Sequence, residues 1–142
     1  MIGLHLGSGR TANHGWKIWY SKRDKDPRIW PLGNYIALAK QLQACNPNVK
    51  FVLTGSRNEK FLSKPFIKAI PDTINLIGKT SLQQMTALMQ YLSLFITQDT
   101  GPLHVASATN ISLISMFGIT NPLCTGPYPV RPQHTIIKNC RQ

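Results

Sequence analysis

The scarcest residues in this sequence are the acidic ones. Against 16 lysines and arginines there are five carboxylates, which leaves a net charge of +11; they are Asp24, Asp26, Glu59, Asp72 and Asp99. No two of them recur at helical spacing, which argues against catalysis by a pair of carboxylates on one helix face. The positive excess favours anionic partners, and nucleic acid, phosphorylated small molecules and acidic membrane surfaces all stay open.

Cysteine and long apolar runs are also scarce. The three cysteines, Cys45, Cys124 and Cys140, are odd in number and form no CxxC pair. This argues against a disulfide framework or a zinc site and favours a reducing cytosol, so we expect no bound metal. The start, MIGLHLGSG, lacks the basic and long apolar regions of a signal peptide. No apolar run approaches about 20 residues, so we expect no membrane span and a cytoplasmic protein.

What the sequence does have is a strict alternation of strand and helix patterns over 142 residues, the size of one domain. Short apolar runs predict strands at 2–6, 49–54, 74–77, 94–97, 111–117 and 135–137. Helical periodicity and capping boxes predict helices at 32–44, 57–69, 82–91 and 102–109, with a break or kink at Pro65. The strands are continuously apolar, which is typical of a parallel sheet covered on both faces. We therefore predict one α/β domain with a Rossmann-like, doubly wound parallel sheet.

Small and polar residues follow nearly every predicted strand. In parallel sheets, ligands bind beyond the carboxyl ends of the strands, and small residues let the backbone approach a nucleotide pyrophosphate. The segment from Asp99 to His104 is the most distinctive, because Pro102 suits a first helical turn and free N–H groups there favour anions. Two interpretations stay open from the pattern alone. In one, His104 donates to a phosphate; in the other, Asp99 or Thr100 only caps the helix and His104 packs.

Several stretches in order resemble one known family. DTGPLHVASA at 99–108, SMFGITNP at 115–122 and TGPY at 125–128 are similar to the signature of the ADP-heptose:lipopolysaccharide heptosyltransferases, glycosyltransferase family 9. IGLHLGSG, RIWP, FVLTGS and LIGKTSLQQMTALM resemble the family's earlier strand ends and turns. The resemblance runs from residue 2 to about residue 128.

The resemblance implies a GT-B architecture of two Rossmann-like domains. It implies that residues 1–142 form the C-terminal domain, which binds the nucleotide-sugar donor, ADP-heptose, and that the N-terminal acceptor domain is absent. The implied reaction is metal-independent sugar transfer to the lipopolysaccharide core. The family's general base lies in the N-terminal domain, so the catalytic residue is unknown here and the isolated chain is expected to be incomplete. The alternative is a non-catalytic or split-enzyme nucleotide-binding module that needs a partner domain.

The resemblance also implies roles for residues of the 99–104 segment. Asp99, Thr100, Gly101 and His104 correspond to positions that contact the donor's diphosphate and sugar. Arg28, the basic residue before x-Trp-Pro, corresponds to one that meets the diphosphate.

Other implied donor contacts lie earlier in the chain. Gly7 and Ser8 are expected beside the phosphates, and Thr80 and Ser81 fall where the family's chain passes the adenine. Glu59 is the candidate for holding the ribose, and it is equally explained as the capping-box partner of a serine.

The loop 16–30 holds all three tryptophans among basic residues. Three interpretations stay open: a solvated loop with Trp30 packed on the core, an anchor at the anionic inner-membrane face where the family's acceptor lipid resides, and stacking on nucleic acid. Nucleic acid is the least favoured of the three.

Overall fold

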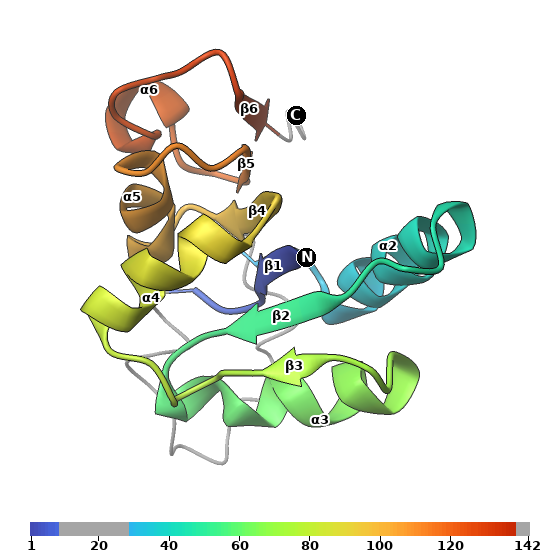
Figure 1. The fold of residues 1–142 in the computed structure, drawn as a ribbon. Helices are drawn as coiled ribbons and strands as arrows, with labels where there is room; N and C mark the ends of the chain where they lie inside the picture. The colour runs from blue at the N-terminus through green and yellow to red at the C-terminus, as the bar shows by residue number, and fades with distance from the viewer. Residues whose placement is uncertain (9–28, 139–142) are drawn as a thin grey trace.

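The fold was analysed in a computed structural model that describes residues 1–8 and 29–138 (Figure 1). The strands are β1 (Ile2–His5), β2 (Phe51–Thr54), β3 (Ile74–Asn75), β4 (Leu94–Gln98), β5 (Leu113–Phe117) and β6 (His134–Lys138). The helices are α2 (Leu32–Cys45), α3 (Lys60–Ala69), α4 (Leu82–Leu88), α5 (Gly101–Ser107) and α6 (Pro122–Thr125). Short 3-10 turns, Arg57–Glu59 and Met89–Tyr91, precede α3 and follow α4.

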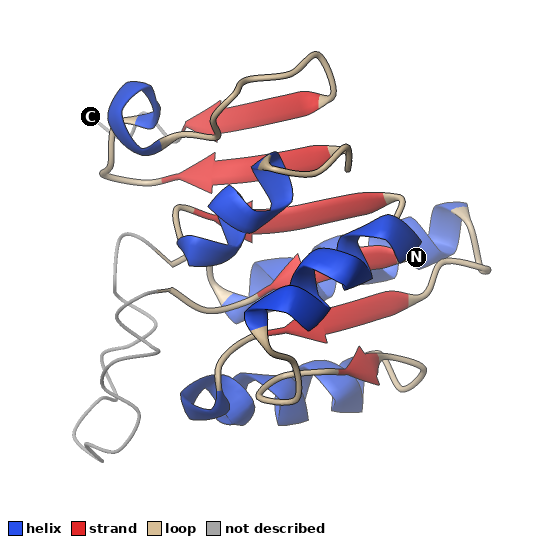
Figure 2. Cartoon of the chain, turned by 60° about the vertical axis from the view of Figure 1, so that its left-hand side comes forward, coloured by secondary structure: helices blue, strands red, loops and turns tan. Residues whose placement is uncertain are grey.

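The strands form one sheet in the order β3-β2-β1-β4-β5-β6, and every neighbouring pair is parallel. In Figure 2, α4 and α5 lie in front of the sheet, and α2 and α3 lie behind it. The predicted doubly wound parallel sheet is therefore confirmed. The strand order reverses direction between β1 and β4, and this switch point is where open α/β sheets leave a crevice for ligands.

Alternate strand residues build a core on each face of the sheet. Leu4, Phe51 and Leu53 pack toward α2 and α3, whereas Val52 and Phe95 pack toward α4 and α5. The core on the α4 and α5 side packs against β1 at Gly3. A Cβ there would lie 2.6 Å from Leu92 Cδ1 and 2.7 Å from Phe95 Cδ2. A residue without a side chain is needed there because interiors are close-packed.

One expectation about local structure, the break at Pro65, is corrected, and one helix was not predicted. Helix α3 runs through Pro65 without a break, because tertiary packing outweighs the lost hydrogen bond: the neighbouring Phe66 is buried and packs edge to face on Phe51 at 6.3 Å. The segment after β5, which showed no helical pattern, contains α6, whose N-cap Asn121 accepts a hydrogen bond from the Leu123 N–H at 3.1 Å. Both predicted capping boxes are confirmed. No helix in the described ranges has the length and apolarity needed to cross a bilayer.

Candidate functional site

The candidate site lies at the carboxyl edge of the sheet, where β1 and β4 separate. The chain leaves β1 through Gly7 and Ser8, which are both buried, and leaves β4 through Asp99 and Thr100. Because β1 and β4 are hydrogen-bonded neighbours, the structure brings these two turns together as the sequence predicts. Arg28 lies outside the described residues.

Gln98, the last residue of β4, links the elements around this switch point. Its side chain is 1% exposed. Its Nε2 donates to the carbonyl oxygens of Leu6 at 3.3 Å and Gly7 at 3.4 Å, and its Oε1 accepts from the Trp30 N–H at 2.7 Å. The amide therefore ties β4 to the β1 turn and to the Trp30-Pro31 turn that starts α2. Gln98 was not among the predicted site residues; a long polar side chain at the end of an apolar strand was the available signal.

The Asp99–His104 turn differs from a simple helix cap. Thr100 occupies the N-cap position of α5, but its hydroxyl makes no capping bond. Instead Thr100 Oγ1 lies 3.3 Å from Thr97 Oγ1 and donates to the Gln98 carbonyl at 3.4 Å. Capping by the Thr100 side chain is therefore wrong. Asp99 Oδ2 accepts from Thr125 Oγ1 at 3.0 Å instead of capping α5, and this bond joins the β4 end to α6.

The start of α5 is accessible at two positions. A Cβ at Gly101 would meet no atom of the described residues within 4 Å, and the side chain of His104, on the first turn, is exposed. A ligand can therefore reach the first-turn backbone of α5 and the His104 ring from the solvent. His104 does not pack in the core, so the structure contradicts that interpretation of the histidine.

Glu59 faces inward. Its side chain is 2% exposed, and its carboxylate accepts from the Ser56 N–H at 2.6 Å, as the capping box predicts. Burial lowers the pKa of the nearby His5 imidazole, and the negative charge of Glu59 partly opposes that shift. Burial also raises the pKa of Tyr35, whose hydroxyl donates to the His5 carbonyl at 3.1 Å. The ribose role of Glu59 stays a prediction.

A hollow of about 380 Å³ lies beyond the ends of β2 and β3. Its lining includes Thr80 and Ser81, the two residues predicted near an adenine, and two exposed cations, Arg57 and Lys79. Gly78 shapes the hollow with a positive φ of 70°, and a Cβ there would lie 2.9 Å from the Arg57 Cα. The hydroxyl of Ser81 caps α4 by accepting from the Gln84 N–H at 3.2 Å.

Comparison with known proteins shows which family this chain resembles. The family model for glycosyltransferase family 9 (heptosyltransferase) matches residues 20–142. The lipopolysaccharide core heptosyltransferase OpsX of Haemophilus influenzae is 32% identical over 109 residues, which cover 76% of this chain and 30% of that protein. Lipopolysaccharide heptosyltransferase 2 of Escherichia coli is 32% identical over 103 residues, which cover 69% of this chain and 29% of that protein. The chain thus spans about 30% of the length of these relatives.

Solved structures agree with the sequence matches. The E. coli ADP-heptose lps heptosyltransferase II superposes with a TM-score of 0.79 at 25% identity, over 100% of this chain and 39% of that one. The E. coli heptosyltransferase WaaC, solved with ADP, has a TM-score of 0.76 over 96% of this chain and 37% of that one; at 18% identity this likeness shows the fold alone. With the family model matching most of its length, this chain belongs to glycosyltransferase family 9, the heptosyltransferase family.

Proposed function

We propose that this chain is the donor-binding domain of a heptosyltransferase, which binds ADP-heptose for transfer to the lipopolysaccharide core. The observation that carries the proposal is the Asp99–His104 turn at the switch point, in a member of this family, with open space before Gly101. A relative of the same fold is described as an ADP-heptose lps heptosyltransferase. Carboxyl edges at switch points are also where this class of sheet binds nucleotides.

The donor would lie along this edge with its diphosphate and sugar at the Asp99 turn. The Gly101 N–H and the exposed His104 ring would donate to phosphate oxygens, since open helix starts and imidazoles favour anions. Asp99 would accept from sugar hydroxyls, because a carboxylate repels the diphosphate itself. Gly7 and Ser8 would line the other side of the crevice.

The nucleoside would extend toward the hollow beyond β2 and β3. Thr80 and Ser81 line that hollow and offer hydroxyl and backbone groups to an adenine, while Arg57 and Lys79 add positive charge beside it. Glu59 would reach the ribose only if its carboxylate left the Ser56 N–H, and breaking that buried bond has a cost.

In the transfer reaction, negative charge grows on the departing diphosphate, and groups that donate to it lower the barrier. His104 and the start of α5 would supply this stabilisation, with Arg28 as a further proposed contributor. The acceptor hydroxyl also needs a general base. Among the described carboxylates, Glu59 is buried and Asp72 pairs with Lys50 at 3.1 Å, and Asp99 is already assigned to the donor's sugar in this proposal. We therefore propose that the isolated chain binds the donor without transferring its sugar.

The proposed acceptor is a membrane lipid, so we propose that the protein acts at the cytoplasmic face of the inner membrane. A second candidate is a nucleotide-binding module that acts only with a separate acceptor domain. An ADP-release assay tests whether the chain acts alone. Steady release of ADP from ADP-heptose and lipopolysaccharide core by this chain alone would overturn the proposal that it does not transfer the sugar, and release only after addition of an acceptor domain supports the module.

Calorimetry with ADP and ADP-heptose tests the donor site directly. We expect Asp99→Asn to weaken binding of ADP-heptose by about 10- to 100-fold, as loss of charge-assisted hydrogen bonds does, and to leave ADP binding nearly unchanged. Asp72→Asn is the matched control, because Asp72 precedes β3 at the opposite edge of the sheet. The donor-site proposal fails if the wild-type chain binds neither ligand, or if both variants bind ADP-heptose equally.

A further inference from the structure

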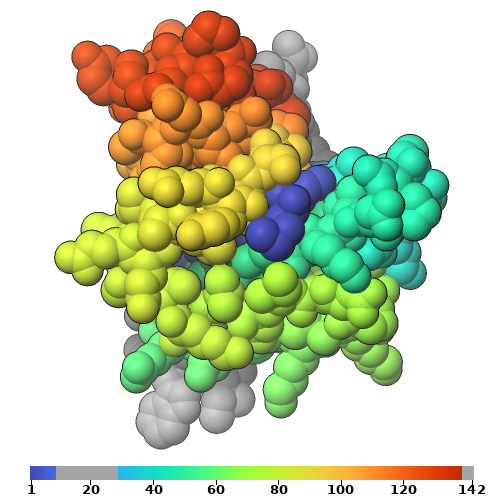
Figure 3. All heavy atoms as spheres, viewed as in Figure 1, coloured from blue at the N-terminus to red at the C-terminus, as the bar shows by residue number. Residues whose placement is uncertain are grey.

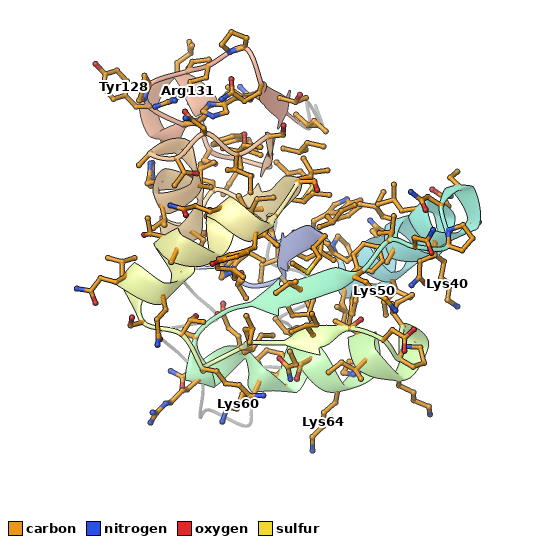
Figure 4. All side chains as sticks on the ribbon, in the orientation of Figure 1. Lys40, Lys50, Lys60, Lys64, Tyr128 and Arg131 are labelled. Atoms are coloured by element: carbon orange, nitrogen blue, oxygen red, sulfur yellow. The ribbon has the colours of Figure 1, made fainter. Side chains whose placement is uncertain are left out.

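The outer face of α3 carries a row of lysines that the donor site does not use. Lys60, Lys64 and Lys68 recur every four residues and are all exposed. The row spans about 12 Å along the helix. In Figure 4, Lys60 and Lys64 point away from the sheet at the lower edge of the molecule, apart from Lys40 and Lys50. The green side chains of this segment project from the same edge in the space-filling view (Figure 3).

Among the residues that the structure describes, no carboxylate pairs with this lysine row. None of the three lysines forms an ion pair with a residue in 1–8 or 29–138. Of the acids in those ranges, Glu59 faces the interior, Asp72 pairs with Lys50, and Asp99 accepts from Thr125. Neighbouring lysines lie within one Debye length of each other, so their potentials add at physiological salt.

The lysine row works against the stability of α3. Like charges four residues apart destabilise a helix, and Lys60 places a cation at the positive N-terminal end. Phe61, beside the row, is 40% exposed, and the adjacent Pro65 is exposed as well. Natural proteins break local stability rules mainly at functional or strained sites.

We propose that the lysine row of α3 is the face by which this protein lies on an anionic lipid bilayer. Basic residues flanked by an exposed aromatic are typical of helices that lie at a membrane surface. Lysine is depleted in protein–protein interfaces, and single-stranded nucleic acid stacks successive bases on several aromatics, whereas α3 exposes one aromatic, Phe61. Anionic headgroups need only a dense positive potential. This inference uses one part of the proposed function, namely that the acceptor is a membrane lipid.

Vesicle partition of the full chain tests this assignment. The probe is vesicles of phosphatidylglycerol and phosphatidylcholine in equal parts, with pure phosphatidylcholine as the uncharged comparison. Replacing each lysine of the row by glutamine is expected to lower the partition coefficient about fivefold, and the triple variant Lys60→Gln/Lys64→Gln/Lys68→Gln about 100-fold. The matched control is Lys40→Gln/Lys50→Gln/Lys138→Gln, which removes the same charge from exposed sites elsewhere. Its partition coefficient should fall far less. Circular dichroism checks that both variants fold.

Three results would overturn the assignment: equal losses in the two triple variants, equal wild-type binding to charged and uncharged vesicles, or wild-type binding to duplex DNA with none to charged vesicles. Calorimetry with ADP on Lys64→Gln/Lys68→Gln separates this inference from the donor site. These two lysines lie outside the hollow, so ADP affinity should not change. If the wild-type chain binds charged vesicles through the row and never binds ADP, the donor-site proposal fails and the membrane face stands.

Discussion

Replacing Gln98 by leucine is the sharpest test of how the switch point is held together. The substitution keeps an apolar body of similar size at the end of β4 and removes every side-chain hydrogen bond. The Trp30 N–H would lose its 2.7 Å acceptor, and the Leu6 and Gly7 carbonyls would lose donors at 3.3 and 3.4 Å. A buried donor left without a partner costs about 1–3 kcal/mol.

The two long carbonyl contacts are weaker than the Trp30 bond, so we expect a total loss of about 3 kcal/mol in the free energy of unfolding. For a chain of this length each kcal/mol lowers the Tm by about 2–4 °C, which predicts a fall of about 6–12 °C. Urea and thermal unfolding followed by circular dichroism measure both values. Gln83→Leu, at an exposed position of α4, is the control. Equal stability of the two variants would refute the view that Gln98 ties these segments together.

Two further predictions concern buried and strained positions. Burial holds the His5 pKa below its usual 6.5, so the unfolded chain binds more protons below that value and stability falls as the pH drops from about 7 toward 5. His5→Gln should make that decline shallower in urea unfolding at several pH values, and an unchanged slope would contradict the argument. Gly78→Ala places a side chain at φ 70°, 2.9 Å from the Arg57 Cα, and should cost about 1–2 kcal/mol of stability. Gly33→Ala, on α2, should be neutral or stabilising, because a Cβ there meets no described atom within 4 Å. If both variants lost the same stability, backbone strain at Gly78 would not be the cause.

Local sequence signals predicted most of the elements. The helix expected at 32–44 is α2, Leu32–Cys45, and the strand expected at 94–97 is β4, Leu94–Gln98. These patterns succeed because apolar periodicity and capping residues act over a few neighbouring positions. The break expected at Pro65 was wrong and α6 was not predicted, because burial of Phe66 and capping by Asn121 outweighed the local composition.

The candidate site, too, was predicted only in part. The sequence predicted that Gly7, Ser8 and the Asp99 turn meet at one edge, and the parallel β1–β4 pairing confirms it. It did not predict that the Thr100 hydroxyl turns back toward Gln98, or that Asp99 is joined to Thr125. Both contacts depend on how the 99–104 segment is placed against its neighbours, which no local pattern reports.

The sequence by itself determined the alternation of strands and helices, the parallel sheet and the family motif at 99–108, because these depend on residue type and short spacing. Only the tertiary structure decided the strand order, the inward position of Glu59 and the role of Gln98. The residues that Gln98 joins are 68, 91 and 92 positions away from it along the chain. Contacts over such separations are set by which strands pair at the switch point, and that choice belongs to the packed sheet as a whole.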